Sequence, residues 1–154
     1  MSHLSKDSPR TIWSKDAMPL VPVRYRSLYT VVLPGVYIGL ILFGISSYFV
    51  GSKVVADFTV QWFSPAWAVT TFVGSLLSLL GLALIHEKVE MVGEFIVGVG
   101  LLIYIAATGL YIIGGSPTSI LTLIFTALRL VTVVWRIRDL TGEIARKAVT
   151  RARS

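Results

Sequence analysis

Six polar residues recur at helical spacing in the last hydrophobic segment of the chain: Thr118, Thr122, Thr126, Arg129, Thr132 and Arg136. At about 100° per residue they share one side of a helix whose remaining surface is apolar, and we call them the polar stripe. A charge such as Arg129 inside a membrane helix costs about 2.5 to 3.5 kcal/mol. Arg129 should therefore face protein or water, either as a hydrogen-bonded structural arginine or as part of a polar path, gate or ligand site.

The partners of Arg129 should come from other apolar segments at a matching depth. Counting residues from the segment ends gives three hydroxyl groups at this depth: Tyr37, Ser78 and Tyr104. Glu94 is the only carboxylate near the interior of a segment, and it lies one or two helical turns from the level of Arg129. An ion pair between the two would require both side chains to stretch toward each other. The hydroxyl neighbours and the ion pair are alternatives that the sequence leaves open.

Small residues also recur at helical spacing in the apolar segments: Gly35, Gly39, Gly74, Ser78, Gly81 and Gly100. Small side chains let helix backbones approach closely, and this packing stabilises helix pairs in lipid, where the hydrophobic effect between helices is absent. The pattern predicts helix packing, either within one chain or between copies of it.

Catalytic and metal-binding motifs are missing from the sequence. It contains no G-x-S-x-G, no phosphate loop, no cysteine and no histidine inside an apolar segment that could ligate a haem. His86, Glu90 and Glu94 recur every four residues, but they do not form the H-E-x-x-H zinc pattern, and the chain must turn there. We expect a protein that is not an enzyme and binds no metal or cofactor, with these three residues at a solvated hairpin tip.

Composition and segment length place the polar residues in a membrane protein. The chain has 154 residues, of which 55% are hydrophobic and 14% charged, too apolar for a soluble domain of this size. Four apolar segments approach the roughly 20 residues with which a helix crosses a bilayer: about 29–50, 66–85, 92–113 and 117–135. We expect an all-α, integral membrane four-helix bundle over residues 29–135, with a basic N-terminal arm over 1–28 and a basic C-terminal helix or tail over 136–154.

Lysine and arginine gather on both sides of the predicted bundle. Five precede the first segment and six follow the last, whereas only Lys53 lies between the first two segments. The positive-inside rule then predicts that both termini are cytoplasmic, as an even number of spans requires. The net charge of +6 predicts attraction to anionic lipid headgroups rather than to nucleic acid. We expect a multi-pass protein of the inner, cytoplasmic membrane.

The order of these features resembles the small four-span membrane proteins of actinobacterial phages, some of which are called holins. The shared layout is a basic arm, four short spans, a Ser-Pro-Ala-Trp corner at residues 64–67 and Trp-Arg-Ile-Arg-Asp-Leu at residues 135–140 before a basic tail. The resemblance covers the whole layout and rests on no catalytic motif, so it transfers no functional residue. It implies a holin-like protein that self-assembles in the membrane and opens a lesion.

Other functions fit the same features. The chain could be an accessory or structural subunit of a larger membrane complex, or a phage exclusion or immunity membrane protein, with the polar stripe buried against a partner. Two four-span chains could also pair around Arg129 as a transporter for an anionic substrate. We expect holin-like permeabilisation first, by a homo-oligomer or within a larger membrane complex.

Overall fold

The structure, a computed structural model of the whole chain, describes residues 11–14, 23–50, 62–115 and 119–152. Within these residues the chain is all-helical, and four helical spans are long and apolar enough to cross a membrane. The elements are α1 (Val23–Ser27), the π-helix η1 (Leu28–Val32), α2 (Leu33–Val50), α4 (Phe63–Ala83), α5 (Glu87–Ile113) and α6 (Ile120–Ala152). The first three are consecutive and together contain the first span, Tyr25–Val50.

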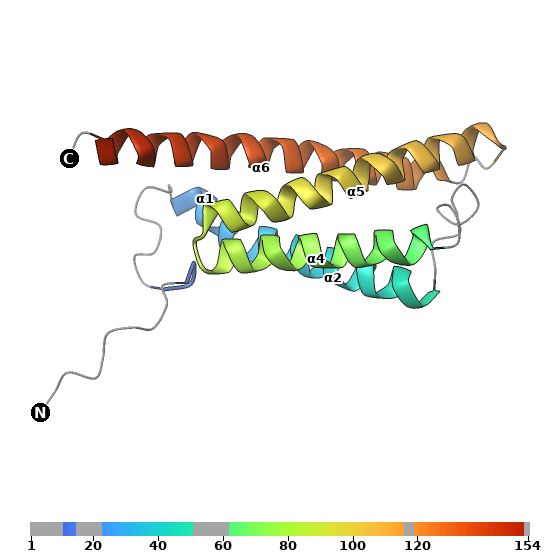
Figure 1. Ribbon diagram of the computed structural model, residues 1–154, viewed down its shortest axis with the longest axis horizontal. Coiled ribbons are helices and arrows are strands. Elements are labelled where there is room, and N and C mark those ends of the chain that lie inside the picture. The colour runs from blue at the N-terminus through green and yellow to red at the C-terminus, as the bar shows by residue number, and fades with distance from the viewer. Residues whose placement is uncertain (1–10, 15–22, 51–61, 116–118, 153–154) are drawn as a thin grey trace, which may run out of the picture.

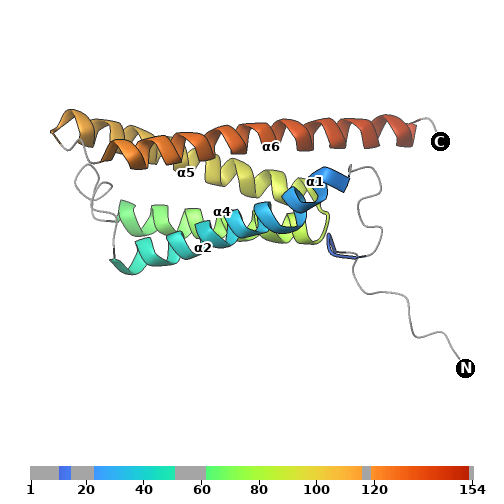
Figure 2. The ribbon, with the colours of Figure 1, turned by 180° about the vertical axis from the view of Figure 1, so that it is seen from behind.

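The long helices pack in chain order, each against the next one along the chain. α4 lies between α2 and α5, and α6 packs along α5 (Figures 1 and 2). Within the described residues the backbones of α2 and α6 make no close approach, and only side chains join them. α6 is therefore attached to the rest of the bundle mainly through α5.

α1, the connection between α4 and α5, and the C-terminal half of α6 lie at the same end of the bundle (Figure 2). We call it the basic end, because it exposes Arg26, Arg138 and Arg146. The 33 residues of α6 correspond to about 50 Å of helix. This exceeds the roughly 30 Å of hydrocarbon in a bilayer, and α6 extends beyond the other helices at the basic end (Figure 1).

The four apolar segments are confirmed as helices, but three of the helices extend farther toward the basic end than the apolar residues predicted. The first begins at Val23, α5 begins at Glu87, and α6 continues to Ala152. The interpretation of Glu90 and Glu94 as part of a solvated hairpin tip is therefore wrong, since both glutamates are buried, and Glu90 lies in the first turn of α5. Hydropathy underestimates a helix wherever polar residues in its first turns find partners on another helix.

Small residues allow α4 and α5 to approach closely. A Cβ added to Gly81 would overlap the backbone of Glu90, and one added to Gly93 would overlap the backbone of Ser78. One added to Gly74 would come within 2.9 Å of a side-chain carbon of α5. Gly100 accepts a hydrogen bond of 3.0 Å at its carbonyl from an indole N–H of α4. The packing predicted for the small residues of the second and third spans is therefore confirmed within one chain.

The Gly35 and Gly39 pair of α2 differs from this seam. Both glycines are exposed, and a Cβ added to either would have nothing within 4 Å. Of the two alternatives for this pair, packing within the chain is not observed, because α2 contacts α4 through its opposite side, which carries Gly44 and Tyr37. The pair instead lies on the outer surface of the bundle.

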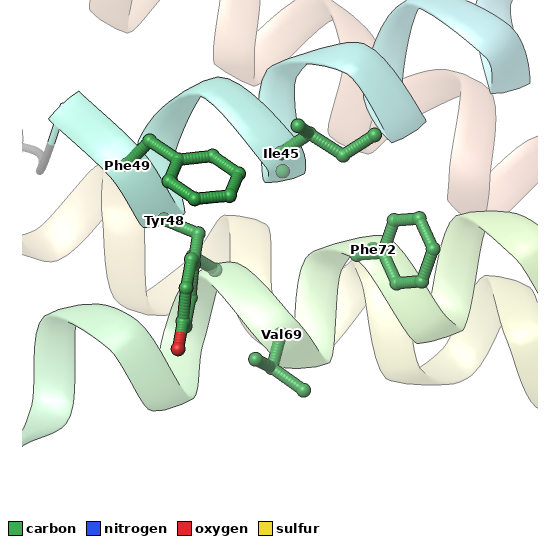
Figure 3. A pocket seen from close by; sticks show the side chains of 7 residues that line it. Ile45, Tyr48, Phe49, Val69 and Phe72 are labelled. Carbon is green, nitrogen blue, oxygen red and sulfur yellow. The ribbon is translucent and has the colours of Figure 1, made fainter.

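An apolar pocket of about 190 Å³ lies between α2 and α4 (Figure 3). Aromatic and aliphatic side chains line it, including Tyr48, Phe49 and Phe72. No charged residue lines it, and nothing in the described residues indicates what would occupy it.

Candidate functional site

Two buried glutamates of α5 form ion pairs with two arginines of α6. Arg136 donates to both carboxylate oxygens of Glu90, from Nε at 2.6 Å and from Nη2 at 2.9 Å. Arg129 Nη2 lies 3.2 Å and 3.3 Å from the two oxygens of Glu94. Glu90 is 2% exposed and Glu94 0%, so both charges are removed from solvent. Buried carboxylates require such charge-assisted hydrogen bonds, and the two pairs are formally neutral.

Tyr37 connects α2 to both ion pairs. Its hydroxyl donates to Oε1 of Glu94 at 2.6 Å and lies 3.2 Å from Oε1 of Glu90. A phenol has only one proton, so the two carboxylates share one donor. The guanidinium of Arg129 lies 5.6 Å from the centre of the Tyr37 ring, within cation-π range. This fully buried tyrosine thus contacts both glutamates and one arginine.

The network continues toward the basic end through Asp139. Arg136 Nη1 donates to Asp139 Oδ2 at 2.8 Å, and the Tyr29 hydroxyl donates to the same oxygen at 3.2 Å. The Arg136 guanidinium also lies 5.0 Å from the centre of the Tyr29 ring. We call the whole set the polar clasp: Tyr29, Tyr37, Glu90, Glu94, Arg129, Arg136 and Asp139.

Helical spacing places the members of the clasp opposite one another. Glu90 and Glu94 are one turn apart on α5, and Arg129 and Arg136 are two turns apart on α6. Between the two arginines lies Val133, which is 1% exposed and packs against residues of α5. Only 11% of the residues in the most apolar stretch of α6 are buried, against 22% to 44% in the other three spans. The clasp therefore supplies much of what holds α6 in place.

Comparisons of the chain with protein-family models, with curated proteins and with solved structures found no match. The function must therefore be inferred from the geometry of the clasp. Both buried carboxylates are engaged by guanidinium groups, so the clasp joins helices electrostatically rather than presenting a free acid or base. Within the described residues no three histidine or acidic side chains gather in a way that could hold a metal ion.

The structure forms the ion pair between Arg129 and Glu94 that the sequence left open. The hydroxyl neighbours are correct only for Tyr37. Ser78 Oγ is buried without a hydrogen-bond partner, and Tyr104 stacks on a tryptophan of α4 with ring centroids 5.1 Å apart. Their expected contact with Arg129 is wrong, because both residues belong to the interface between α4 and α5. Arg129 lies farther from the basic end than Glu94, so its side chain extends toward that end to reach the carboxylate. The Nε atom of Arg129 is buried without a hydrogen-bond partner.

The polar stripe of α6 is divided between protein contacts and the outer surface. Arg129 Nη1 donates to Thr132 Oγ1, which lies 2.7 Å from the Arg129 carbonyl as well. Thr126 donates to the carbonyl of Thr122. Thr122 and Thr132 are exposed, and Thr118 lies outside the described residues. The threonine hydroxyls thus bond mainly to their own helix, and only the arginines reach the other helices.

Sequence patterns did not identify Glu90, Asp139 and Tyr29 as members of the site. One signal could have identified Glu90. Glu90 lies one turn from Glu94 on the same face of one helix, and Arg129 and Arg136 lie two turns apart on the same face of another. Two such helices that run antiparallel can pair both glutamates with both arginines. No pattern in the sequence places Tyr29 beside Asp139, since 110 residues separate them along the chain.

Proposed function

We propose that this protein is a non-enzymatic, holin-like membrane protein that self-assembles and opens an aqueous path, with α6 as the helix that rearranges. One observation carries this proposal. α6 bears the two clasp arginines, yet among the described elements its backbone approaches closely only that of α5, and it is the least buried of the four spans. A helix attached in this way can separate from the bundle without disrupting the packing of α2, α4 and α5.

The charges of the clasp favour two states. With the clasp closed, Arg129 and Arg136 are neutralised by Glu94 and Glu90, so the chain can remain in lipid. Separating a buried pair without replacing its partners costs about 3 to 5 kcal/mol. Water in a pore can replace those partners, whereas lipid cannot. Separation of α6 is therefore favourable only where several copies surround water, which couples opening to assembly.

The outer surface of the bundle supports assembly of several copies. Gly35 and Gly39 face outward on α2, and small residues are the usual contact points between membrane helices. The exposed side of α6 is apolar and includes Leu121, Phe125 and Leu128. We place the basic end in the cytoplasm, against anionic headgroups of the inner membrane, by the positive-inside rule.

The same apolar side of α6 favours a second candidate. A subunit of a larger membrane complex, or an exclusion or immunity protein, would cover this surface with a different protein rather than with further copies. The transporter hypothesis is less well supported, because the guanidinium of Arg129, which would have to bind the anionic substrate, is already paired with Glu94.

Inducible expression in bacterial cells tests the proposal. The protein should accumulate in the membrane and then abruptly collapse the membrane potential and admit an impermeant dye. The matched control replaces Glu94 and Arg129 together by leucine. This variant should accumulate normally, because an apolar pair replaces an ion pair, and should admit less dye. Accumulation of the wild-type protein to the same level without dye entry, with stoichiometric purification of a second protein, would support the subunit function instead.

A further inference from the structure

Residues 11–14 of the N-terminal arm dock onto the basic end of the bundle (Figure 1). They form a compact turn, in which the Ser14 N–H donates to the Thr11 carbonyl at 2.9 Å. The Ile12 N–H donates to the Ala83 carbonyl at 3.1 Å, and the indole N–H of Trp13 donates to a carbonyl of the first span at 3.1 Å. These bonds join a segment that precedes the first span to two different helices.

Neither carbonyl has the i+4 amide donor that it would have inside a regular α-helix. In an α-helix the Thr30 carbonyl would accept from residue 34, but Pro34 has no N–H. Here the backbone forms the π-helix Leu28–Val32, and the Trp13 indole supplies a donor to Thr30. Ala83 is the last residue of α4, where carbonyls have no partner in the helix. The turn is therefore complementary to two specific backbone acceptors.

The side chain of Ile12 belongs to the same apolar cluster as Tyr37 of the clasp. Ile12 is 5% exposed and packs in one cluster with Leu33, Tyr37 and Leu82. Tyr37 is the residue whose hydroxyl contacts both Glu90 and Glu94. Residues 11–14 thus share an apolar cluster with the side chain that joins α2 to the two ion pairs.

We propose that residues 11–14 are a latch that holds the polar clasp closed. With the latch docked, Tyr37 is fixed against both glutamates, and water cannot enter from the basic end. The attachment consists of one buried side chain and two hydrogen bonds, and Trp13 remains 58% exposed. It is therefore much smaller than the interface between α4 and α5, so the latch can leave while the helices stay packed. Its docking is a property of the fold, and only its effect on opening rests on the proposed function.

The absence of cysteine from the chain makes a direct test possible. A single cysteine in place of Leu82, which is 3% exposed and belongs to the same cluster as Ile12, reports departure of the latch when a membrane-impermeant maleimide is applied at the basic end. Labelling should be slow with the latch intact. Trp13→Phe removes only the indole N–H and should raise the labelling rate about fivefold, the factor that corresponds to one lost hydrogen bond. Ile12→Asp should raise the rate further.

Two controls separate departure of the latch from general unfolding. Trp62→Phe makes the same chemical change at an exposed tryptophan of another segment and should leave the labelling rate unchanged. A cysteine in place of Ala68, fully buried beside the aromatic cluster of α4, should stay unlabelled in every variant. Labelling of both reporters in Ile12→Asp would mean loss of the bundle, and the conservative Trp13→Phe then decides the question.

Fast labelling of the Leu82→Cys reporter with the native latch, or equal rates in the native chain and Trp13→Phe, would overturn the latch. The outcome is distinguishable from failure of the proposed function. If labelling rises while dye entry in cells stays absent, the latch is correct and permeabilisation is not the function. If both hold, Ile12→Asp should admit dye earlier after induction than the native chain.

Discussion

The Tyr37 hydroxyl donates a 2.6 Å hydrogen bond to Glu94, the carboxylate that also receives the guanidinium of Arg129. This contact joins α2, α5 and α6 at one point. Elsewhere each long helix packs along its neighbour in chain order. A tyrosine on the first span therefore helps to determine whether the last span stays attached.

Tyr37→Phe should destabilise the bundle by about 1.5 to 3 kcal/mol, the usual contribution of a hydrogen bond to a charged group. The ring remains beneath Arg129, so the change removes only the hydroxyl. Reversible unfolding in mixed detergent micelles measures the effect. Tyr48→Phe is the matched control, because Tyr48 is exposed on the same helix, and it should change stability by less than about 0.5 kcal/mol. Equal effects for the two variants would contradict a role for the hydroxyl.

Arg129→Leu alone should destabilise the protein by about 3 to 5 kcal/mol, because it leaves Glu94 buried without its counter-charge. Adding Glu94→Leu should restore most of this stability, since an apolar pair in place of a buried ion pair is often neutral or stabilising. Membrane abundance and detergent unfolding of the two single variants and the double variant form a complete cycle. A double variant as unstable as the sum of its parents would show that the two side chains do not act as a pair.

A disulfide between α5 and α6 should prevent opening. A Cβ added to Gly98 would lie 3.2 Å from Val133 Cγ1, so Gly98→Cys with Val133→Cys places two thiols within reach of each other. Cells that express the oxidised protein should exclude dye, and a membrane-permeant reductant should restore dye entry. Each single-cysteine variant under the same treatment is the control. Dye entry through the fully crosslinked protein would exclude separation of α6 as the opening step.

Gly35→Ile with Gly39→Ile should leave the stability of the single chain nearly unchanged, because open space surrounds both positions. It should reduce self-association by removing the close approach that small residues permit. Subunit counting by photobleaching in lipid discs measures the association. Gly81→Ile provides the contrast, since its side chain would collide with the backbone of Glu90 and should unfold the helix pair. Unaltered association of the α2 variant would assign assembly to another surface.

The sequence by itself determined the all-helical architecture and the four spans. A stretch of about 20 consecutive apolar residues is long enough to cross a bilayer as a helix, and a helix satisfies its backbone hydrogen bonds internally. It also identified Arg129 as a charge that must find a partner, and it indicated the small-residue seam between α4 and α5. These conclusions depend on periodicity and composition, which are local properties of the chain.

Only the tertiary structure decided which side chains meet. Arg129 pairs with Glu94, which lies at a different depth, rather than with Ser78 or Tyr104 at its own depth. The reason is the orientation of α5 about its axis, which directs Glu94 toward α6 and Tyr104 toward α4. Periodicity gives the face of a helix but not the neighbour that the face meets. Likewise, no local pattern connects Trp13 with the Thr30 carbonyl, whose α-helical donor position is taken by Pro34, since this contact depends on how residues 11–14 lie against the helices.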